Sequence, residues 1–333
     1  MLEFSSPGSA RLFLANSSAS ACDRLAVAER GYSLRYTDPA AMLAWCEAAA
    51  VNLPSSMPAS EVGLLLGHLG NAHRVCCHLS EAELYLRQAH AAAPDDPLIL
   101  EFYASFMRDK RQLPVAAKFL SRAATLRRSS GDSVGHASTL LNSALVLGEA
   151  GFPDQAMMQV LTALDFIGLL PPTDERERLA RAGFQNLATY LVEAGRAREA
   201  LWVVRSCRDR LLLGGEVFRL RLDWLMADIF GALGEIASAV ATYEAIRNGF
   251  IALGLSHDVA LVTLDLARLL LKTQALRARE EALSVWPIFD ALGIDRDARE
   301  AKLLAEVVET AAEGPLLELL AALRSGVLAR RRL

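Results

Sequence analysis

The chain has 333 residues, of which 53% are hydrophobic, 22% are charged and 7% are aromatic. This composition excludes an intrinsically disordered protein and supplies enough apolar material for a core, and the length is typical of about two domains. The formal net charge is −4, which gives no global sign of a nucleic-acid or anionic-membrane partner.

No segment of the sequence is typical of an exported or membrane-spanning protein. The apolar runs fall short of the ~18 residues that a transmembrane helix needs. Near the N-terminus only residues 12–15 are continuously apolar, which is too short for the core of a secretory signal. The five cysteines are an odd number scattered through a long chain, which fits a reducing compartment better than a disulfide framework. We therefore expect a cytoplasmic protein.

The first 59 residues are predicted to be a short terminal segment followed by helices. Residues 1–20 are rich in Ser and Ala, and we expect them to be mobile. Residues 22–36 are predicted to form a helix that is interrupted near Gly31. Asp38 followed by Pro39 is a favourable start for a second helix, which we expect to end near Asn52. Residues 21–59 thus form an N-terminal helical segment.

A pair of helices is predicted within residues 63–96, and its pattern returns along the chain. Apolar and small residues at helical spacing fall into two halves, with a polar break between them. Small residues in both halves let the two helices approach closely. The small residue of the first half recurs at Gly70, Ala104, Ala144, Ala188, Ala227 and Ala267, and that of the second half at Ala82, Ala116, Ala156, Ala200, Ala239 and Ala278.

The ends of the first helices carry a second repeating signal. Gly151, Gly195 and Gly234 each follow the small residue by seven positions, where a first helix would end in a left-handed cap. No segment alternates with the period of a β-strand, so we expect no sheet.

The small and apolar residues around Gly70 and Ala82, followed by Pro94, resemble the consensus of the tetratricopeptide repeat (TPR). The resemblance covers residues 60–293. The period of about 40 residues is similar to that of the repeats in bacterial regulators of the MalT-like and Rap-like groups. Ser143 and Asp223 depart from the pattern, because those positions are commonly apolar. The resemblance implies an all-α fold, a right-handed α-solenoid of about six helix pairs with capping helices at both ends.

Residues 294–333 are predicted to form the C-terminal cap. Asp295 can start a helix that runs to about Ala312, and Pro315 starts a final helix. That last helix reaches the basic tail of Arg330, Arg331 and Arg332. A solenoid needs atypical end units to cover its exposed faces, and these helices would do so.

One cluster of histidine and cysteine residues raises the alternative of a metal site. His73, Cys76 and Cys77 fall close together on one helix end, with His68 and His78 nearby in the sequence. A fourth ligand at a suitable spacing is missing, and there is no Cys-x-x-Cys pair. In the repeat register His73 takes a position that is apolar in the other repeats. We expect a packed core histidine, and neither a metal nor another cofactor.

The sequence also lacks the motifs of the common enzyme classes. It has no Gly-x-Ser-x-Gly elbow, no Gly-rich phosphate loop after a strand and no His-Glu-x-x-His helix. Adjacent acids such as Glu280 and Glu281 point apart on a helix and fit a solvated face. We therefore expect no catalytic residue.

The charges are unevenly distributed along the chain. Residues 108–128 carry seven basic side chains and one acid, a local charge of +6, whereas residues 290–313 carry a local charge of −4. Such a dipole could steer an oppositely charged partner. Lys118 and Arg122 fall on a second helix, which in the family lies on the convex side, so a solubilising role is favoured and nucleic acid is not an expected partner.

The resemblance implies that the first helices line a concave groove that binds a peptide segment. Asn71 matches one residue of the family's carboxylate clamp, but Gly67 replaces its first lysine, so the clamp is partial. Trp224 is a candidate anchor, since aromatic residues often dominate interfaces, and its alternative is burial against a neighbouring helix. The groove positions in the register are Asn71, Arg74, Glu101, Ser105, Arg108, Gln185, Thr189, Arg221, Trp224, Asp228, Arg268 and Lys272, together with Leu141, Glu149, Glu193 and Leu264.

Three functions stay open at this point. The first is a non-enzymatic scaffold or adaptor that binds a protein or peptide in the groove. The second is a regulatory sensor that responds to a peptide or small effector and acts on a partner in trans. The third is a metal-binding or enzymatic helical protein that uses His73, Cys76 and Cys77. The sequence leaves open whether the N-terminal helices fill the groove and whether the chain dimerises.

Overall fold

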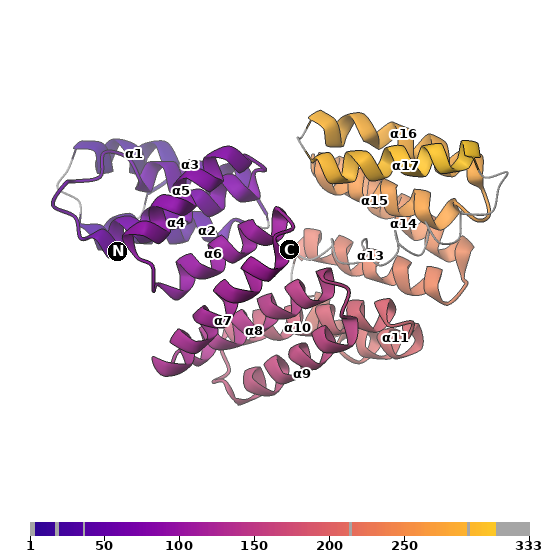
Figure 1. Ribbon diagram of the computed structural model, residues 1–333, viewed down its shortest axis with the longest axis horizontal. Coiled ribbons are helices and arrows are strands. Elements are labelled where there is room, and N and C mark those ends of the chain that lie inside the picture. Colours follow the sequence, from indigo (N-terminus) through magenta and orange to yellow (C-terminus); the bar gives the residue numbers. More distant parts are fainter. Residues whose placement is uncertain (1–3, 17–19, 36, 213–214, 292–293, 311–333) are drawn as a thin grey trace. The chain divides into compact units, whose positions relative to one another are not determined.

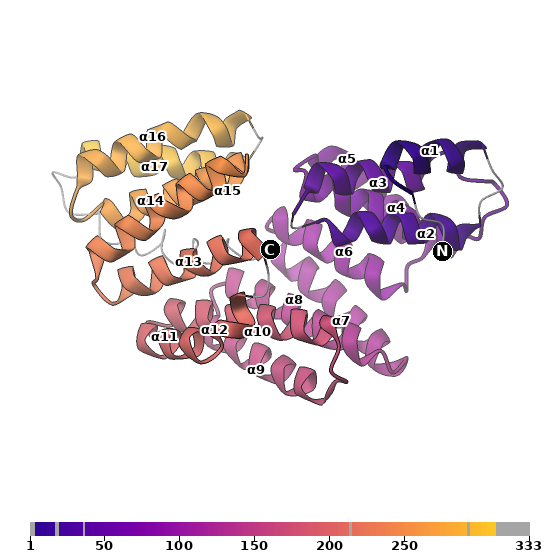
Figure 2. The same ribbon diagram turned by 180° about the vertical axis from the view of Figure 1, so that it is seen from behind.

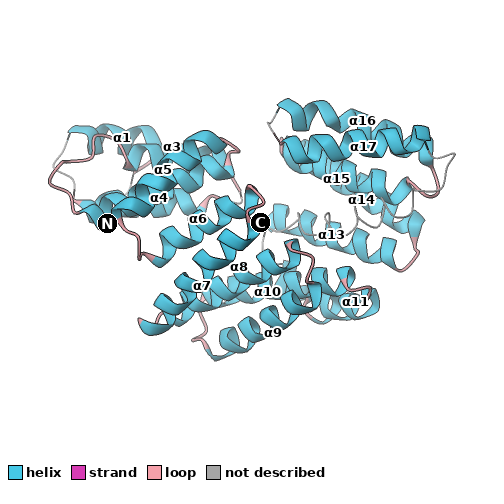
Figure 3. Ribbon diagram, viewed as in Figure 1, coloured by secondary structure: helices cyan, strands magenta, loops and turns pink. Residues whose placement is uncertain are grey.

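The structure, a computed structural model of the chain, describes residues 4–16, 20–35, 37–212, 215–291 and 294–310. These residues form seventeen helices and no strand, as expected for an all-α helical repeat (Figure 3). They divide into two compact units. Unit 1 holds the residues up to 146 together with residues 165–170, and unit 2 holds residues 147–164 and those from 171 onward.

Unit 1 begins with three helices that lead into two complete helix pairs (Figure 1). The three leading helices are α1 (Pro7–Asn16), α2 (Ala21–Ser33) and α3 (Pro39–Ala49). The pairs are α4 (Ala59–Val75) with α5 (Leu79–Ala92) and α6 (Pro97–Asp109) with α7 (Leu113–Ser129), and the greater part of α8 (Ser133–Glu149) follows.

Unit 2 contains most of α9 (Pro153–Leu169) and three helix pairs (Figure 2). A single-turn helix, α12 (Arg208–Leu211), follows the first pair, and α17 (Asp295–Thr310) packs on α16 and α15 at the end. The pairs are α10 (Asp174–Glu193) with α11 (Ala197–Ser206), α13 (Gly215–Ala232) with α14 (Ile236–Ala252), and α15 (Ser256–Leu270) with α16 (Ala275–Ala291).

Buried small residues bring the two helices of each pair together, which confirms the predicted repeat register. A Cβ atom added to Gly70 would lie 2.8 Å from Cγ of Leu86 and 3.0 Å from its backbone nitrogen, so no larger residue fits without a shift. The other small residues are at most 2% exposed: Ala82, Ala104, Ala116 and Ala144 in unit 1, and Ala156, Ala188, Ala200, Ala227, Ala239, Ala267 and Ala278 in unit 2.

The predicted left-handed caps are present, and two non-glycine residues take the same conformation at the ends of other first helices. Gly151, Gly195 and Gly234 have φ angles of 87°, 76° and 84°. Cys77 and Arg111 hold the equivalent positions in the first two pairs, with φ angles of 62° and 61°. A side chain there costs on the order of 1 kcal/mol relative to glycine, so the first two turns are locally strained.

The N-terminal segment differs from the sequence prediction in two respects. Residues 1–20 were expected to be mobile, but Pro7–Asn16 form α1, and its Leu14 is buried. The buried guanidinium of Arg24 donates hydrogen bonds to the carbonyl oxygens of Leu14 at 2.8 Å and Ala49 at 3.0 Å, so α1 is attached to α2 and α3. The expected interruption near Gly31 is also wrong, since α2 continues through it.

Helices α2 and α3 form a further pair that the predicted repeat count omitted. Gly31 precedes Gly70 by 39 residues, one repeat period. A Cβ atom at Gly31 would lie 2.9 Å from Cβ of Trp45 and 3.0 Å from the carbonyl oxygen of Met42, both on α3. The glycine therefore permits the close helix contact that small residues permit in the other pairs.

The C-terminal cap is described only in part. The helix predicted from Asp295 to about Ala312 is α17, which extends to Thr310. Ala312, the helix predicted from Pro315 and the basic tail lie outside the described residues. Among the helices that the structure describes, none is both long enough and apolar enough to cross a bilayer.

Candidate functional site

The predicted groove positions lie on the first helices of both units. In unit 1 Asn71 and Arg74 are on α4, and Glu101, Ser105 and Arg108 are on α6. The positions in unit 2 are Gln185 and Thr189 on α10, Arg221, Trp224 and Asp228 on α13, Arg268 on α15, and Lys272 in the turn that follows α15.

In unit 1 the groove positions of α4 and the end of α6 form one hydrogen-bonded network. Arg74 donates from Nε to Oδ1 of Asn71 at 3.0 Å and from Nη1 to Oδ2 of Asp109 at 2.7 Å. Arg108 donates to the other oxygen of Asp109 at 3.3 Å. Burial alone would raise the pKa of Asp109, but the two guanidinium groups outweigh it and lower that pKa. The side-chain oxygen of Asn71 is thus bonded within the fold, and the residue is only 2% exposed.

Glu101 is also held inside unit 1. Its carboxylate accepts hydrogen bonds from Nε of Arg127 at 2.8 Å and from the hydroxyl of Thr139, and Arg127 also binds Asp132. Burial raises the pKa of Glu101 despite the neighbouring guanidinium. Ser105, on the next turn of α6, is half-buried and is the more accessible of the two.

Trp224 in unit 2 lies in the core, so the alternative of burial is what the structure shows. The residue is only 4% exposed and its ring meets that of Phe250 edge to face at 6.0 Å. Its indole N–H donates to Oδ2 of Asp265 at 3.0 Å. A partner therefore has no access to the side chain that seemed the best anchor.

Ion pairs link the successive first helices of unit 2. Arg221 on α13 binds Asp258 on α15 at 3.5 Å. Arg268 on α15 binds Asp265 on its own helix and Glu300 on α17. These contacts fix the three helices to one another through charged side chains.

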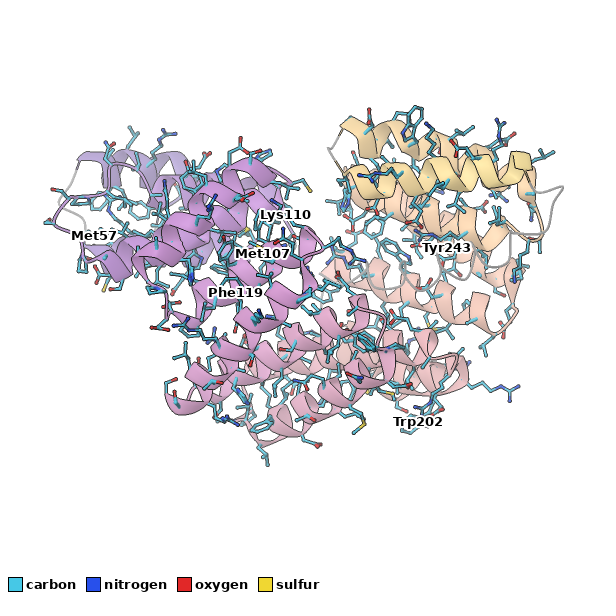
Figure 4. The ribbon with its side chains drawn as sticks, in the orientation of Figure 1. Met57, Met107, Lys110, Phe119, Trp202 and Tyr243 are labelled. Carbon is cyan, nitrogen blue, oxygen red and sulfur yellow. The ribbon has the colours of Figure 1, made fainter. Side chains whose placement is uncertain are left out.

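A second buried contact in unit 2 joins a first helix to its own second helix. Tyr243 on α14, which is labelled in Figure 4, donates a hydrogen bond from its hydroxyl to the carboxylate of Asp228 on α13. Tyr243 is buried, and burial together with the charge of Asp265 raises its pKa well above the ordinary value. The hydroxyl therefore stays protonated and acts as the donor.

Only some of the predicted positions in unit 2 are open to solvent. Thr189 is buried and its hydroxyl donates to the carbonyl oxygen of Gln185 at 2.9 Å. Gln185, Arg221 and Arg268 are half-buried, and Lys272 is exposed. The accessible surface of these first helices is therefore polar, with cationic groups among its members.

The histidine and cysteine cluster in unit 1 is packed against neighbouring helices. His73 is buried, stacks on Tyr85 at 5.3 Å between ring centroids, and places Nδ1 3.4 Å from Nδ1 of His78. Burial raises the pKa of both Cys76 and Cys77, which keeps the thiols protonated. In the described part of the chain, histidine, cysteine and acidic side chains do not gather in threes as metal ligands would.

Acidic residues from outside the basic stretch of residues 108–128 neutralise part of its charge in the folded chain. Lys110 binds Glu83 at 2.8 Å, and Arg122 binds Asp95. These acids come from α5 and from the turn before α6, outside the window over which the sequence charge was counted. Lys118 is exposed on α7, which agrees with the favoured solubilising role.

Comparisons with known proteins identify the fold. No protein-family model matches the sequence, and no curated protein matches it. A Rap protein complexed with Competence and Sporulation Factor is 12% identical, with a TM-score of 0.71 over 93% of this chain and 88% of that one. The apo form of RapI is 11% identical, with a TM-score of 0.61 over 85% of this chain and 99% of that one.

This chain is also similar in fold to a third solved structure. The apo form of the quorum sensor NprR from B. thuringiensis is 12% identical, with a TM-score of 0.56 over 90% of each chain. At these identities the likeness concerns the fold, and it confirms the TPR-like, Rap-like helical repeat that the sequence resembles.

Proposed function

We propose that this protein binds a peptide or protein segment along the first helices of its repeats and has no catalytic activity of its own. The observation that carries the proposal is the set of ion pairs that connect these helices in unit 2. Ion pairs from Arg221 to Asp258 and from Arg268 to Glu300 hold polar side chains in fixed positions on α13 and α15. A surface whose side chains are already ordered loses little conformational entropy when it binds.

The accessible members of this surface suit a peptide backbone and acidic side chains. Gln185 offers both a donor and an acceptor, and Lys272 offers three donors on a flexible stem. Arg221 and Arg268 are half-buried, and their guanidinium groups are paired with Asp258 and Glu300. The ligand class that fits is therefore an extended or helical segment with carbonyl and carboxylate acceptors.

The second candidate function is a regulatory sensor, which the names of two proteins of similar fold suggest. A Rap protein has been solved in complex with Competence and Sporulation Factor, and NprR is described as a quorum sensor. A sensor on this chain would bind its segment on α10, α13 and α15 and pass the change to a partner in trans. The ion pairs between first helices could transmit such a change from one helix to the next. Ligand contact with Arg221 or Arg268 would strengthen or weaken their bonds to Asp258 on α15 and Glu300 on α17.

Affinity capture with matched variants tests the binding proposal. The double variant Gln185→Ala with Lys272→Glu changes two side chains that are at least partly exposed and leaves the ion pairs of Arg221 and Arg268 intact. Lys118→Glu, which makes the same charge change on the second helix α7, is the control. We expect wild type and control to retain a protein or peptide that the double variant loses. Retention of the same set by all three proteins would refute binding at this surface.

Hydrogen–deuterium exchange then separates the sensor from the scaffold. With the captured segment bound, a sensor should show altered exchange in α16 and α17 as well as in α10, α13 and α15. A scaffold should show protection confined to the contacted helices. An unchanged α17 would therefore contradict the sensor.

A further inference from the structure

Successive second helices of this array touch each other at fixed register positions. In unit 1 the ring of His90 on α5 meets that of Phe119 on α7 edge to face at 5.4 Å between centroids. In unit 2 Arg247 on α14 binds Glu281 on α16 at 2.7 Å. In both contacts the first residue lies eight positions, and the second three positions, after the small residue of its own helix: Ala82, Ala116, Ala239 and Ala278. The eighth position therefore faces the next second helix.

Helix α16 is the last second helix in the described part of the chain (Figure 1). Its eighth position is Trp286, which is 39% exposed. The equivalent residues of four earlier second helices are half-buried: His90, Ala124, Leu164 and Arg247. Trp286 thus has the position, but not the burial, of a residue that a following helix covers, and a large aromatic ring gains most from such cover.

A second apolar residue accompanies Trp286 on the same side of α16. Leu283, three residues earlier, is 38% exposed, and its equivalent on α14 is Glu244, which binds Arg277 of α16. Leu161 of α9 is equally exposed at this position, so the exposure of Leu283 counts only together with that of Trp286. We call Leu283 and Trp286 the α16 face. Charged residues at these positions of α14 pair with charged residues of α16, whereas the apolar α16 face fits an apolar helix.

The sequence after α17 has the pattern of such a helix. Residues 311–333 lie outside the described residues. Apolar side chains recur in their sequence at helical spacing: Leu316, Leu320, Leu323 and Val327. Gly314 and Pro315 precede them, which is typical of a turn followed by a helix start. Four residues separate Thr310 from Pro315, as four separate the end of α15 from the start of α16. A link of that length returns the chain along the helix that it left.

Length and charge of this segment also match α16. Residues 315–330 are nearly as long as α16, which has 17 residues. Second helices of a repeat array run parallel, so the segment would begin beside the start of α16 and end beside its end. Glu318 would then lie near Arg279 of α16, and Arg330 near the exposed Asp290. Opposite charges thus coincide at both ends of the two helices.

We propose that residues 315–330 of this chain form a second helix paired with α17 and cover the α16 face. The leucines and Val327 of the segment pack on Leu283 and Trp286, while Ala322 and Ser325 on its opposite side face water. The segment ends the repeat array, because a terminal unit has to cover the apolar side that each repeat offers to the next. The α16 face lies on a second helix, so this proposal is independent of the binding surface on the first helices.

Photo-crosslinking within the full chain tests this proposal. A benzophenone side chain takes the place of Trp286, and unlabelled and isotope-labelled chains are mixed before irradiation. Mass spectrometry should find crosslinks from position 286 to residues 315–330, and both ends of each crosslink should carry the same label because they belong to one chain. The same group in place of Glu280, an exposed residue on another side of α16, should give no crosslink to this segment.

Substitutions on the two sides of the segment complete the test. Leu320→Asp with Leu323→Asp should abolish the crosslink, whereas Ala322→Asp with Ser325→Asp, the same charge change on the opposite side, should keep it. In a Trp202→Phe background with Trp286 restored, acrylamide quenching of the tryptophan fluorescence should rise about twofold in the leucine variant alone. The proposal is overturned if position 286 crosslinks to no residue of 315–330, or if both double variants behave alike. Crosslinks that join differently labelled chains would make a second copy the occupant and equally overturn it.

Discussion

Replacing Trp224 with alanine should destabilise unit 2, because this residue is part of its core. The substitution removes a buried indole from its contact with Phe250 and leaves Asp265 without the N–H that lies 3.0 Å from Oδ2. Truncation of a buried tryptophan costs about 3 to 5 kcal/mol. Trp224→Phe keeps an aromatic ring and loses the hydrogen bond to a charged group, so it should cost about 1.5 to 3 kcal/mol.

Urea denaturation followed by far-UV circular dichroism measures both effects. Trp202→Ala on α11 is the matched control, since Trp202 is 70% exposed and its loss should cost clearly less than Trp224→Ala. If Trp224→Ala changed the free energy of unfolding by less than about 1 kcal/mol while abolishing partner binding, Trp224 would be a groove residue and the burial argument would be wrong.

Three further substitutions probe the repeat and one buried histidine. Gly195 has a φ of 76°, and no atom lies within 4 Å of an added Cβ. Gly195→Ala should therefore lower the free energy of unfolding by on the order of 1 kcal/mol through backbone conformation alone, and an unchanged melting temperature would refute the left-handed cap. Ala200→Trp should destabilise by about 1 to 3 kcal/mol or more because its site is fully buried, and an unaltered urea midpoint would count against the register. Burial lowers the pKa of His68 to about 4 in the folded chain. As the pH falls, the imidazole is therefore protonated in the unfolded chain before it is protonated in the folded one, which favours unfolding. About 3 kcal/mol of stability should therefore be lost between pH ~6.5 and ~4, and His68→Phe should flatten that loss when melting is followed against pH.

The repeat architecture was predictable because its cause is local and periodic. Close packing of two helices demands a small residue, and Ala188 or Ala200 can be read from one sequence without knowledge of distant contacts. Gly195 signals its cap because other residues seldom take that conformation. Gly31 is a small residue one repeat period before Gly70, but the prolines between them suggested that the repeats begin only after residue 59.

Whether the predicted groove residues are buried or exposed was not predictable from the register. Register fixes the face of a helix on which a residue lies, whereas burial depends on the helix that packs against that face. Trp224 is a core residue because it packs against Phe250 of α14, and Asp265, 41 positions away, accepts the hydrogen bond of its indole N–H. In the same way Arg74 pairs with Asp109 across 35 positions, a distance at which sequence gives no pairing rule.

The proposed function is tested most directly by placing a photo-reactive crosslinker at single positions of the full chain. A benzophenone side chain at Gln185 on α10 should crosslink the captured peptide or protein segment, and the same group at Lys118 on the second helix α7 should not. Crosslinking at position 118 without crosslinking at 185 would show that the segment binds elsewhere, and the first-helix surface would then not be the binding site.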